Sequence, residues 1–219
     1  HPVLVFFHGG YWKRNHKEEF SFIAGPLAAA GAVTIVVEYP LIPTVKLDGL
    51  VESCRVATAW AWRNADRFDG DPERIHVCGH SAGGHLTAMM MATDWPAYGE
   101  DLPADLVKSG FATSGLYDLE PVRLSSQNDD LDLTDGDVIR NSPMYLQPMN
   151  PGPLTLQVGQ LEGPEFIRQS VDMAVIWREA GIETQTRVLD GQHHFSICSQ
   201  LIDPDSELSR ALKAQIGLG

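Results

Sequence analysis

The stretch R-I-H-V-C-G-H-S-A-G-G, residues 74–84, decides the fold. A short apolar strand runs into a Gly-x-Ser-x-Gly turn, and a helical pattern follows directly. A serine at a tight strand-to-helix turn has strained backbone angles, so its close neighbours must be small, as Gly79 and Gly83 are. The turn lifts the Ser81 hydroxyl clear of the sheet, and the Ala82 amide at the helix N-terminus points at any oxyanion formed there. The sequence thus predicts a nucleophilic serine; the alternative is a glycine-rich turn with an unreactive one.

Strands and helices alternate along the chain on both sides of this turn. Runs rich in β-branched residues are followed by longer segments of helical spacing over short connections. Such alternation predicts an α/β fold with a mostly parallel, doubly wound sheet and helices on both faces. The predicted strands are 3–7, 33–39, 74–79, 107–114, 154–158 and 184–189, and the predicted helices are 17–30, 46–68, 81–92, 165–180 and 201–216.

One segment interrupts this alternation. Residues 116–147 contain S-S-Q-N-D-D-L-D-L-T-D-G-D, which is polar and acidic and has no long period. We interpret the segment as a small cap-like insertion over the edge of the sheet. The whole chain, residues 1–219, is then a single domain with no repeat and no linker.

Composition excludes several classes of function. The chain has 219 residues, which is long enough for one sizeable core, and no apolar run that would span a membrane. Its net charge of −13 repels phosphate backbones and anionic lipid, so we expect no nucleic-acid partner. The three cysteines (Cys54, Cys78 and Cys198) are widely spaced without a CxxC pair. This usage predicts a reducing, cytoplasmic compartment and no zinc site.

The first residues bear on targeting. The chain opens on His1-Pro2 and an apolar run, without an initiator Met. We expect further sequence upstream, and a targeting peptide there is the alternative to the cytoplasmic prediction.

A nucleophilic serine needs a histidine base, and with this kind of turn the acid and then the histidine follow it in sequence. Apart from His85 on the helix that the turn opens, only His193 and His194 come after it, in D-G-Q-H-H-F, just past the last predicted strand. Consecutive side chains diverge, so only one of them can be the base. We favour His194, because Phe195 behind it could pin the loop into the core; His193 is the alternative. We expect no metal at this pair, since no third ligand has suitable spacing.

The acid is predicted from the loop G-Q-L-E-G-P-E-F, residues 159–166. Glu162 occupies the loop at the end of a predicted strand, between the serine and the histidines in sequence. Glu165 is the competitor, although a carboxylate in the first helical turn more often complements the helix dipole. Asp190 lies near the histidines but on the strand side of their loop. We therefore favour Glu162.

The stretch V-F-F-H-G-G-Y-W, residues 5–12, predicts the second half of an oxyanion hole. An apolar strand ends in bare glycines there, so a carbonyl oxygen could approach the amides of Gly9, Gly10 and Tyr11, with Ala82 supplying the other donor. We expect His8 to brace this loop from behind.

Three aromatic side chains are candidates for the substrate pocket. Tyr11 and Trp12 beside the glycine loop suit an aryl amine by stacking and apolar burial, although plain packing against the first helix is an equal alternative. His80, the variable position of the serine turn, is the third candidate. His85, one turn into the helix, is expected to make a structural hydrogen bond instead.

Taken together, these motifs resemble a known family. H-G-G-Y-W, G-H-S-A-G-G-H-L, S-G-L-Y-D-L, G-Q-L-E-G-P-E-F-I-R-Q-S and the terminal H-H-F resemble the arylformamidase (kynurenine formamidase) branch of the α/β-hydrolase superfamily, close to the hormone-sensitive-lipase-like carboxylesterases. The resemblance implies an eight-stranded sheet, a Ser–acid–His triad and an oxyanion hole from the H-G-G loop. The chain departs from it in two ways: the family acid at Glu162 is commonly Asp, and strands usually precede the H-G-G strand.

The resulting prediction is acyl transfer to water through a serine ester. The substrate is a small molecule, with a formyl group on an aryl amine such as N-formylkynurenine favoured. A short-chain carboxylesterase is the alternative, and a catalytically idle hydrolase-like binding domain is a remote one. No metal or organic cofactor is required by this chemistry, and a homodimer is one open oligomeric state.

Overall fold

The strands pair in the arrangement that the alternating pattern predicts. The structure is a computed structural model that describes residues 1–218. Its strands are β1 (Val3–Phe7), β2 (Val33–Val37), β3 (Ile75–His80), β4 (Ser109–Thr113), β5 (Leu154–Gly159) and β6 (Thr184–Leu189). Within the described residues they form one sheet in the order β2-β1-β3-β4-β5-β6, and every pair is parallel. The predicted α/β fold class is confirmed.

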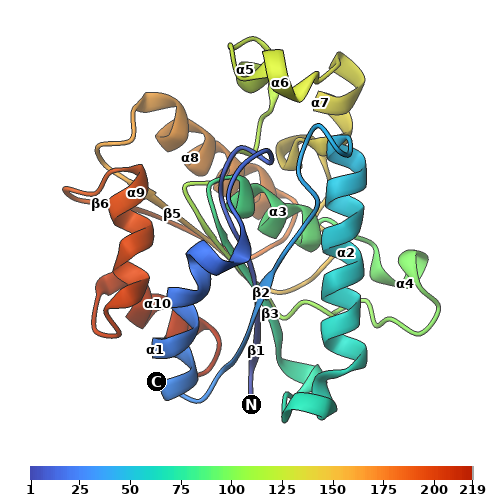
Figure 1. The fold of residues 1–219 in the computed structure, drawn as a ribbon, viewed down its shortest axis with the longest axis vertical. Coiled ribbons are helices and arrows are strands. Elements are labelled where there is room, and N and C mark those ends of the chain that lie inside the picture. The colour runs from blue at the N-terminus through green and yellow to red at the C-terminus, as the bar shows by residue number, and fades with distance from the viewer. Residues whose placement is uncertain (219) are drawn as a thin grey trace.

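Helices cover both faces of this sheet (Figure 1). The helices are α1 (Ala24–Ala29), α2 (Leu47–Arg63), α3 (Ala82–Met91), α4 (Trp95–Tyr98), α5 (Glu120–Arg123), α6 (Asn128–Leu131), α7 (Asp135–Asn141), α8 (Pro164–Glu179), α9 (His194–Ser199) and α10 (Glu207–Gln215). From β1, Val3, Val5 and Phe7 join the core formed with α2, α3 and α8. Leu4 and Phe6 join the opposite core, formed with α1 and α10. All five side chains are fully buried, as expected for an inner strand of a parallel sheet.

The segment 116–147 folds into the short helices α5, α6 and α7, which gather at the upper end of the molecule in Figure 1. Ion pairs join it to the body: Lys13 contacts Asp130 at 2.6 Å, and Arg140 contacts Asp48 at 2.8 Å. The role of this segment as a cap in a single-domain chain stays a prediction.

Several element boundaries differ from the sequence pattern. The helix predicted over 17–30 is a 3-10 helix, η1 (Lys17–Ile23), followed by α1. The last predicted helix, 201–216, is shorter and begins at Glu207 behind a Ser206 cap, and α9 precedes it as a separate helix. The described residues contain six strands, whereas the resemblance implies eight.

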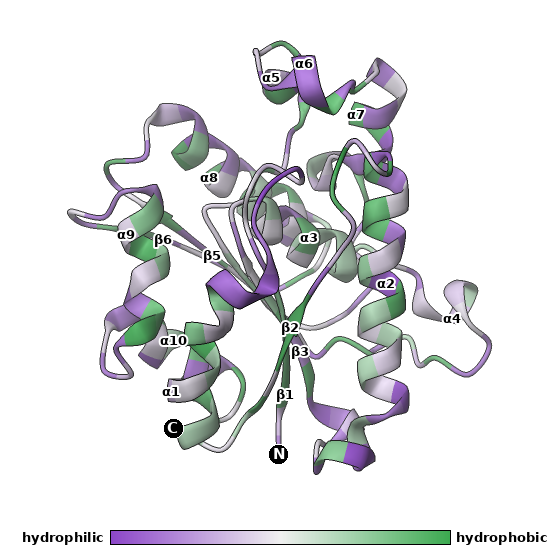
Figure 2. Ribbon diagram, in the orientation of Figure 1, coloured by the Kyte–Doolittle hydropathy of each residue, from purple (hydrophilic) through white to green (hydrophobic). Residues whose placement is uncertain are grey.

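Hydropathy follows the layers of the fold. Figure 2 shows the inner strands as largely hydrophobic, whereas α6 at the surface is hydrophilic. A search of residues 1–218 finds no helix with both the length and the apolar character needed to cross a membrane.

Candidate active site

Ser81 sits in the turn between β3 and α3 with strained backbone angles, φ 58° and ψ −119°. The turn brings three backbone segments so close together that side chains are excluded. A Cβ on Gly79 would lie 2.2 Å from the Gly83 carbonyl oxygen, and a Cβ on Gly83 would lie 1.9 Å from the Phe7 carbonyl oxygen. Glycine is therefore required at both positions, and the sharp turn holds Ser81 at the carboxyl end of the sheet.

His194 lies against this serine. The Ser81 Oγ is 2.9 Å from His194 Nε2, and His194 Nδ1 is 2.6 Å from Glu162 Oε2. Because a carboxylate only accepts hydrogen bonds, Nδ1 carries the proton and Nε2 is left as the acceptor for the serine hydroxyl. This tautomer is the one that a general base for Ser81 needs.

Glu162 is held as a carboxylate by three donors. Its Oε2 accepts from His194, while its Oε1 accepts from the Ser114 hydroxyl at 2.5 Å and from the Gly159 amide at 2.6 Å. The side chain is fully buried. Burial raises the pKa of Glu162, but the three hydrogen bonds outweigh it and the net pKa is lowered.

The alternative acid and base candidates lie elsewhere. His193 caps α9, and its Nδ1 accepts from the Phe195 and Ser196 amides at 3.2 Å each. Glu165 pairs with Arg168 at 2.6 Å. Within residues 1–218, no side-chain hydrogen bond or ion pair joins Asp190 to His194. The structure thus brings together Ser81, Glu162 and His194, and it separates them from His193 and Glu165.

The expectation that Phe195 holds the His194 loop against the core is wrong. Phe195 is 74% exposed, so its ring does not pin the loop into the core. Two other contacts hold the base: His80 Nε2 donates to the His194 carbonyl oxygen at 2.7 Å, and the Phe166 ring lies 4.8 Å from the imidazole. Sequence reasoning missed these contacts because they join residues that are distant in the sequence, with His80 and His194 114 residues apart.

The H-G-G loop has free amides and bound carbonyls. The Gly9 carbonyl accepts from Asn15 Nδ2 at 3.2 Å, and the Gly10 carbonyl accepts from the Arg14 amide at 3.0 Å. No residue among 1–218 accepts a hydrogen bond from the amides of Gly9, Gly10 and Tyr11. Amides without partners beside a nucleophile are the donors that an oxyanion hole needs.

The H-G-G loop has a strained backbone and is supported by side chains behind it. Tyr11 and Trp12 both have left-handed backbone angles, φ 49° and 58°, which side-chain-bearing residues adopt only where the surroundings impose them. Behind the loop, His8 Nδ1 donates to the Gly9 carbonyl at 2.8 Å, and its ring stacks on Tyr39 at 4.1 Å. His8 therefore braces the loop as the sequence suggests. The Ala82 amide, on the opposite side of Ser81, also has no partner within residues 1–218.

Ser81 and His194 open into a pocket of about 520 Å³. Four aromatic rings, from Tyr11, Phe20, Phe22 and Phe195, line it together with Gly9, Gly10, Arg14, Asn15, Glu19, His80, Gln127, Cys198 and Ser199. Tyr11 and His80 thus lie where the sequence placed them.

Trp12 does not line this pocket, and its assignment there was wrong. Its side chain is fully buried, and its Nε1 donates to His85 Nδ1 at 3.2 Å. His85 Nε2 in turn donates to the Asn141 carbonyl at 2.7 Å, so this imidazole is structural. Burial lowers the pKa of His85 to about 4. The indole can be buried in the core because the buried His85 imidazole accepts the hydrogen bond of its N–H group.

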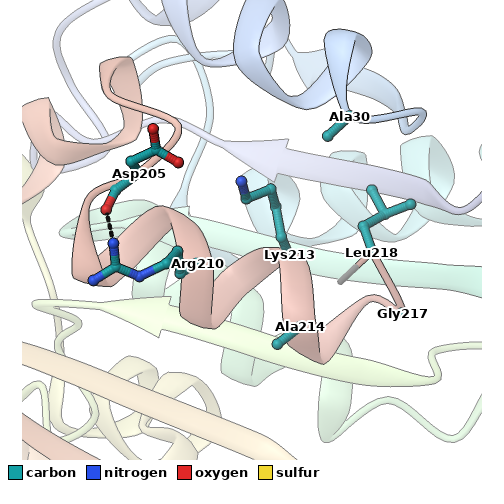
Figure 3. A pocket seen from close by; sticks show the side chains of 7 residues that line it. All are labelled: Ala30, Asp205, Arg210, Lys213, Ala214, Gly217 and Leu218. Atoms are coloured by element: carbon teal, nitrogen blue, oxygen red, sulfur yellow. Dashed lines mark hydrogen bonds between the residues drawn. The ribbon is translucent and has the colours of Figure 1, made fainter.

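A second hollow of about 510 Å³ lies between α1 and α10 (Figure 3). It is lined by Ala30, Asp205, Arg210, Lys213, Ala214, Gly217 and Leu218. Ala30 lies just before β2 begins, at the amino end of the sheet, whereas Ser81 follows the carboxyl end of β3. The lining residues include no serine, cysteine or histidine, so we place no chemistry there. Within residues 1–218, no group of three His, Cys, Asp or Glu side chains could hold a metal ion.

Comparison with known proteins assigns the family. The family model BD-FAE matches residues 1–102. The kynurenine formamidase of Danio rerio is 34% identical over 221 residues, which cover 99% of this chain and 73% of that protein. The chain belongs to the kynurenine formamidase family.

Members and neighbours of this family are hydrolases, and this chain is a hydrolase of the α/β-hydrolase fold. Esterase LipC of Mycobacterium tuberculosis is 36% identical over 119 residues, or 53% of this chain and 29% of that protein. A solved esterase of Pyrobaculum calidifontis superposes with a TM-score of 0.80 at 22% identity, over 98% of this chain and 76% of that chain. This last likeness shows the shared fold.

Sequence reasoning missed one supporting residue of the site. Ser114 donates to Glu162 from the end of β4 and has a left-handed φ of 52°. In the sequence, the S-G-L-Y-D-L motif that begins at this residue contributes only to the family resemblance. Its signal was a small hydroxyl residue directly after a buried strand, at the sheet edge where the acid and base also lie.

Proposed function

We propose that this chain is a serine hydrolase that removes a small acyl group, formyl in preference, from an aryl amine such as N-formylkynurenine. The observation that carries the proposal is the unbroken series of contacts from Ser81 Oγ to His194 Nε2 at 2.9 Å and from His194 Nδ1 to Glu162 Oε2 at 2.6 Å. Nucleophile, base and orienting acid thus lie within hydrogen-bonding reach of one another, as this chemistry requires.

In the first step, Ser81 Oγ attacks the carbonyl carbon of the substrate. His194 Nε2 takes the hydroxyl proton, and the buried Glu162 carboxylate stabilises the imidazolium that results. The negative charge moves to the carbonyl oxygen, where the unpaired amides of the H-G-G loop and of Ala82 would bind it. Each well-placed donor lowers the barrier by on the order of 3 kcal/mol.

The second step breaks the bond to the leaving group. His194 returns its proton to the departing amine nitrogen, and Ser81 keeps the acyl group as an ester. Water then repeats the attack: His194 takes one of its protons, the carboxylic acid leaves, and the serine recovers its hydrogen. The cycle consumes one water and needs no other reagent.

The aryl amine is supported by the walls of the pocket. The rings of Tyr11, Phe20, Phe22 and Phe195 provide the apolar, stackable surface that an aromatic leaving group would bury. The kynurenine formamidase relative supports a formyl acyl group.

A short-chain carboxylesterase is the second candidate. The same three residues would cleave an ester, and the match to esterase LipC favours it. A catalytically idle binding domain has less support, because the described residues keep a nucleophile, base and acid in contact. The cytoplasmic location and a homodimer stay predictions from the sequence.

A substrate panel separates these functions. We would compare kcat/KM of the purified protein for N-formylkynurenine, p-nitrophenyl acetate and p-nitrophenyl butyrate. The proposal expects N-formylkynurenine to be preferred over both esters. Efficient butyrate cleavage without formamide hydrolysis would establish the esterase instead, and no turnover of any of the three would support the idle domain.

A further inference from the structure

The pocket that holds Ser81 contains one strongly basic side chain. Among its fifteen lining residues, Arg14 is the sole lysine or arginine, and Glu19 is the sole carboxylate. The other walls are mostly aromatic rings and small residues. A cation at an aromatic wall next to a nucleophile suggests that the ligand carries a negative group.

Arg14 has no side-chain partner within the part of the chain that the structure describes. Its side chain makes no hydrogen bond or ion pair with any residue among 1–218, although the chain carries 29 acidic residues against 16 basic ones. The neighbouring Lys13 does pair, with Asp130 at 2.6 Å. The pKa of Asp130 is lowered first by Lys13 and more weakly by the charge of Arg14, so Arg14 lies near this carboxylate without bonding to it.

Glu19 does not neutralise Arg14 either. Its Oε1 accepts from the His16 amide at 3.3 Å, so it caps the start of η1. The Arg14 guanidinium therefore presents all its donors to the pocket or to water.

The backbone of Arg14 is fixed to the candidate oxyanion loop. Its amide donates to the Gly10 carbonyl at 3.0 Å, and the next residue, Asn15, donates from its side chain to the Gly9 carbonyl at 3.2 Å. The root of the side chain thus has a fixed position relative to the amides beside Ser81. A charged group anchored in this way can set the orientation of a substrate.

We propose that Arg14 is a specificity residue that binds a carboxylate on the leaving group, while the ring of that group lies among Phe20, Phe22 and Phe195. The inference rests on the proposed function and narrows its substrates to aryl formamides that carry a carboxylate beyond the ring. A planar guanidinium binds a carboxylate through two parallel hydrogen bonds, which a lysine ammonium cannot reproduce.

The test uses two probes that differ in the carboxylate. One is 4-(2-formamidophenyl)-4-oxobutanoate, which has the ring, the formamide and a carboxylate. The other is 2-formamidoacetophenone, which has the same ring and formamide without the acid. Their binding is measured by isothermal titration calorimetry to the Ser81→Ala protein, alone and combined with Arg14→Gln, Arg14→Lys or Lys17→Gln. Lys17 is exposed, does not line the pocket and makes no side-chain hydrogen bond or ion pair with any residue from 1 to 218, so it controls for net charge.

We expect Arg14→Gln to weaken binding of the carboxylate probe by about tenfold or more, and to leave the neutral probe within about twofold. Arg14→Lys should fall between, and Lys17→Gln should change neither probe by more than about twofold. Equal losses on both probes, equal losses from Arg14→Gln and Lys17→Gln, or no measurable binding of the carboxylate probe to Ser81→Ala would overturn the inference.

Binding to the Ser81→Ala protein is measured without turnover. The role of Arg14 and the proposed hydrolase function can therefore be rejected independently of each other. Carboxylate binding that depends on Arg14 in a protein without formamide hydrolysis would reject the proposed function alone. Formamide hydrolysis without such dependence would reject the role of Arg14 alone.

Discussion

Glu162 Oε2 lies 2.6 Å from His194 Nδ1, and the Glu162 side chain is fully buried. Glu165, three residues later, is turned to Arg168 at 2.6 Å and to Gln169 at 2.9 Å. Two carboxylates only three residues apart, one before α8 and one in its first turn, therefore have different environments. Only the first can orient an imidazole, while the second stabilises the start of α8.

This difference makes the two glutamates a matched pair for mutagenesis. Glu162→Gln should lower kcat by about 10⁴, because a neutral amide does not stabilise the imidazolium and its NH₂ group favours the wrong tautomer. Glu165→Gln should stay within about threefold of the wild type, since its ion pair is exposed to solvent. Steady-state kinetics on the preferred substrate checks both, and a larger loss from Glu165→Gln would mean that the wrong carboxylate has been assigned.

Ser114→Ala tests how the acid itself is held. The variant removes the 2.5 Å hydrogen bond to Glu162 Oε1, and with it one of the groups that lower the pKa of this carboxyl. We expect kcat to fall by about tenfold and KM to stay unchanged. The acidic limb of the pH profile of kcat should move to higher pH, because the carboxylate becomes easier to protonate. A loss of thermal stability with an unchanged profile would show a purely structural role.

Gly83 should tolerate no side chain. A Cβ there would lie 1.9 Å from a backbone oxygen of Phe7, so Gly83→Ala should cost at least about 3 kcal/mol of unfolding free energy and abolish activity. Gly25 in α1 has open space around it and serves as the control. Gly25→Ala should stabilise by about 0.5–1 kcal/mol. Urea unfolding measures both changes, and an active, stable Gly83→Ala protein would contradict the described turn.

Buried histidines make the protein less stable in mild acid. Burial lowers the pKa of His76, His80 and His85 to about 4 each, with Arg74 or His194 adding to the effect at the first two. Below pH 6.5 these histidines bind protons in the unfolded chain but stay neutral in the folded chain. The free energy of unfolding therefore falls as the pH drops from about 6.5 towards 4. His16, whose pKa is raised by Glu38, acts in the opposite direction but is a single exposed group.

Urea unfolding at pH 7.5, 6 and 5 measures this effect. We expect the unfolding free energy to decrease with each step, by up to about 1.4 kcal/mol per pH unit for each histidine involved. His85→Gln, which keeps a hydrogen-bonding side chain for Trp12, should reduce the slope. A constant or rising free energy between pH 7.5 and 5 would show that these imidazoles are not held neutral.

The parts of the site that rest on local sequence were predictable. The Gly-x-Ser-x-Gly turn is specified within six residues by close backbone approach, and the order of serine, acid and histidine follows from the parallel sheet. Glu162 and His194 could be predicted because each follows the end of a strand within five residues, at the edge where Ser81 also lies.

The parts that depend on distant contacts were not predictable. Trp12 is buried because His85, 73 residues away, accepts its hydrogen bond, and no local pattern distinguishes this from a pocket residue. Phe195 is exposed because the His193 cap starts α9 and turns the ring outward. Ser114 reaches Glu162 across 48 residues through the pairing of β4 with β5. Side-chain partners of this kind are fixed by tertiary packing.

Hydrolysis of N-formylkynurenine by the wild type and by Ser81→Ala tests the central claim most directly. The wild type should turn over the formamide, and Ser81→Ala, shown by thermal melting to be folded, should lose at least about 10⁴ in kcat. Formamide turnover by the folded Ser81→Ala protein within about tenfold of the wild type would contradict a covalent mechanism at Ser81.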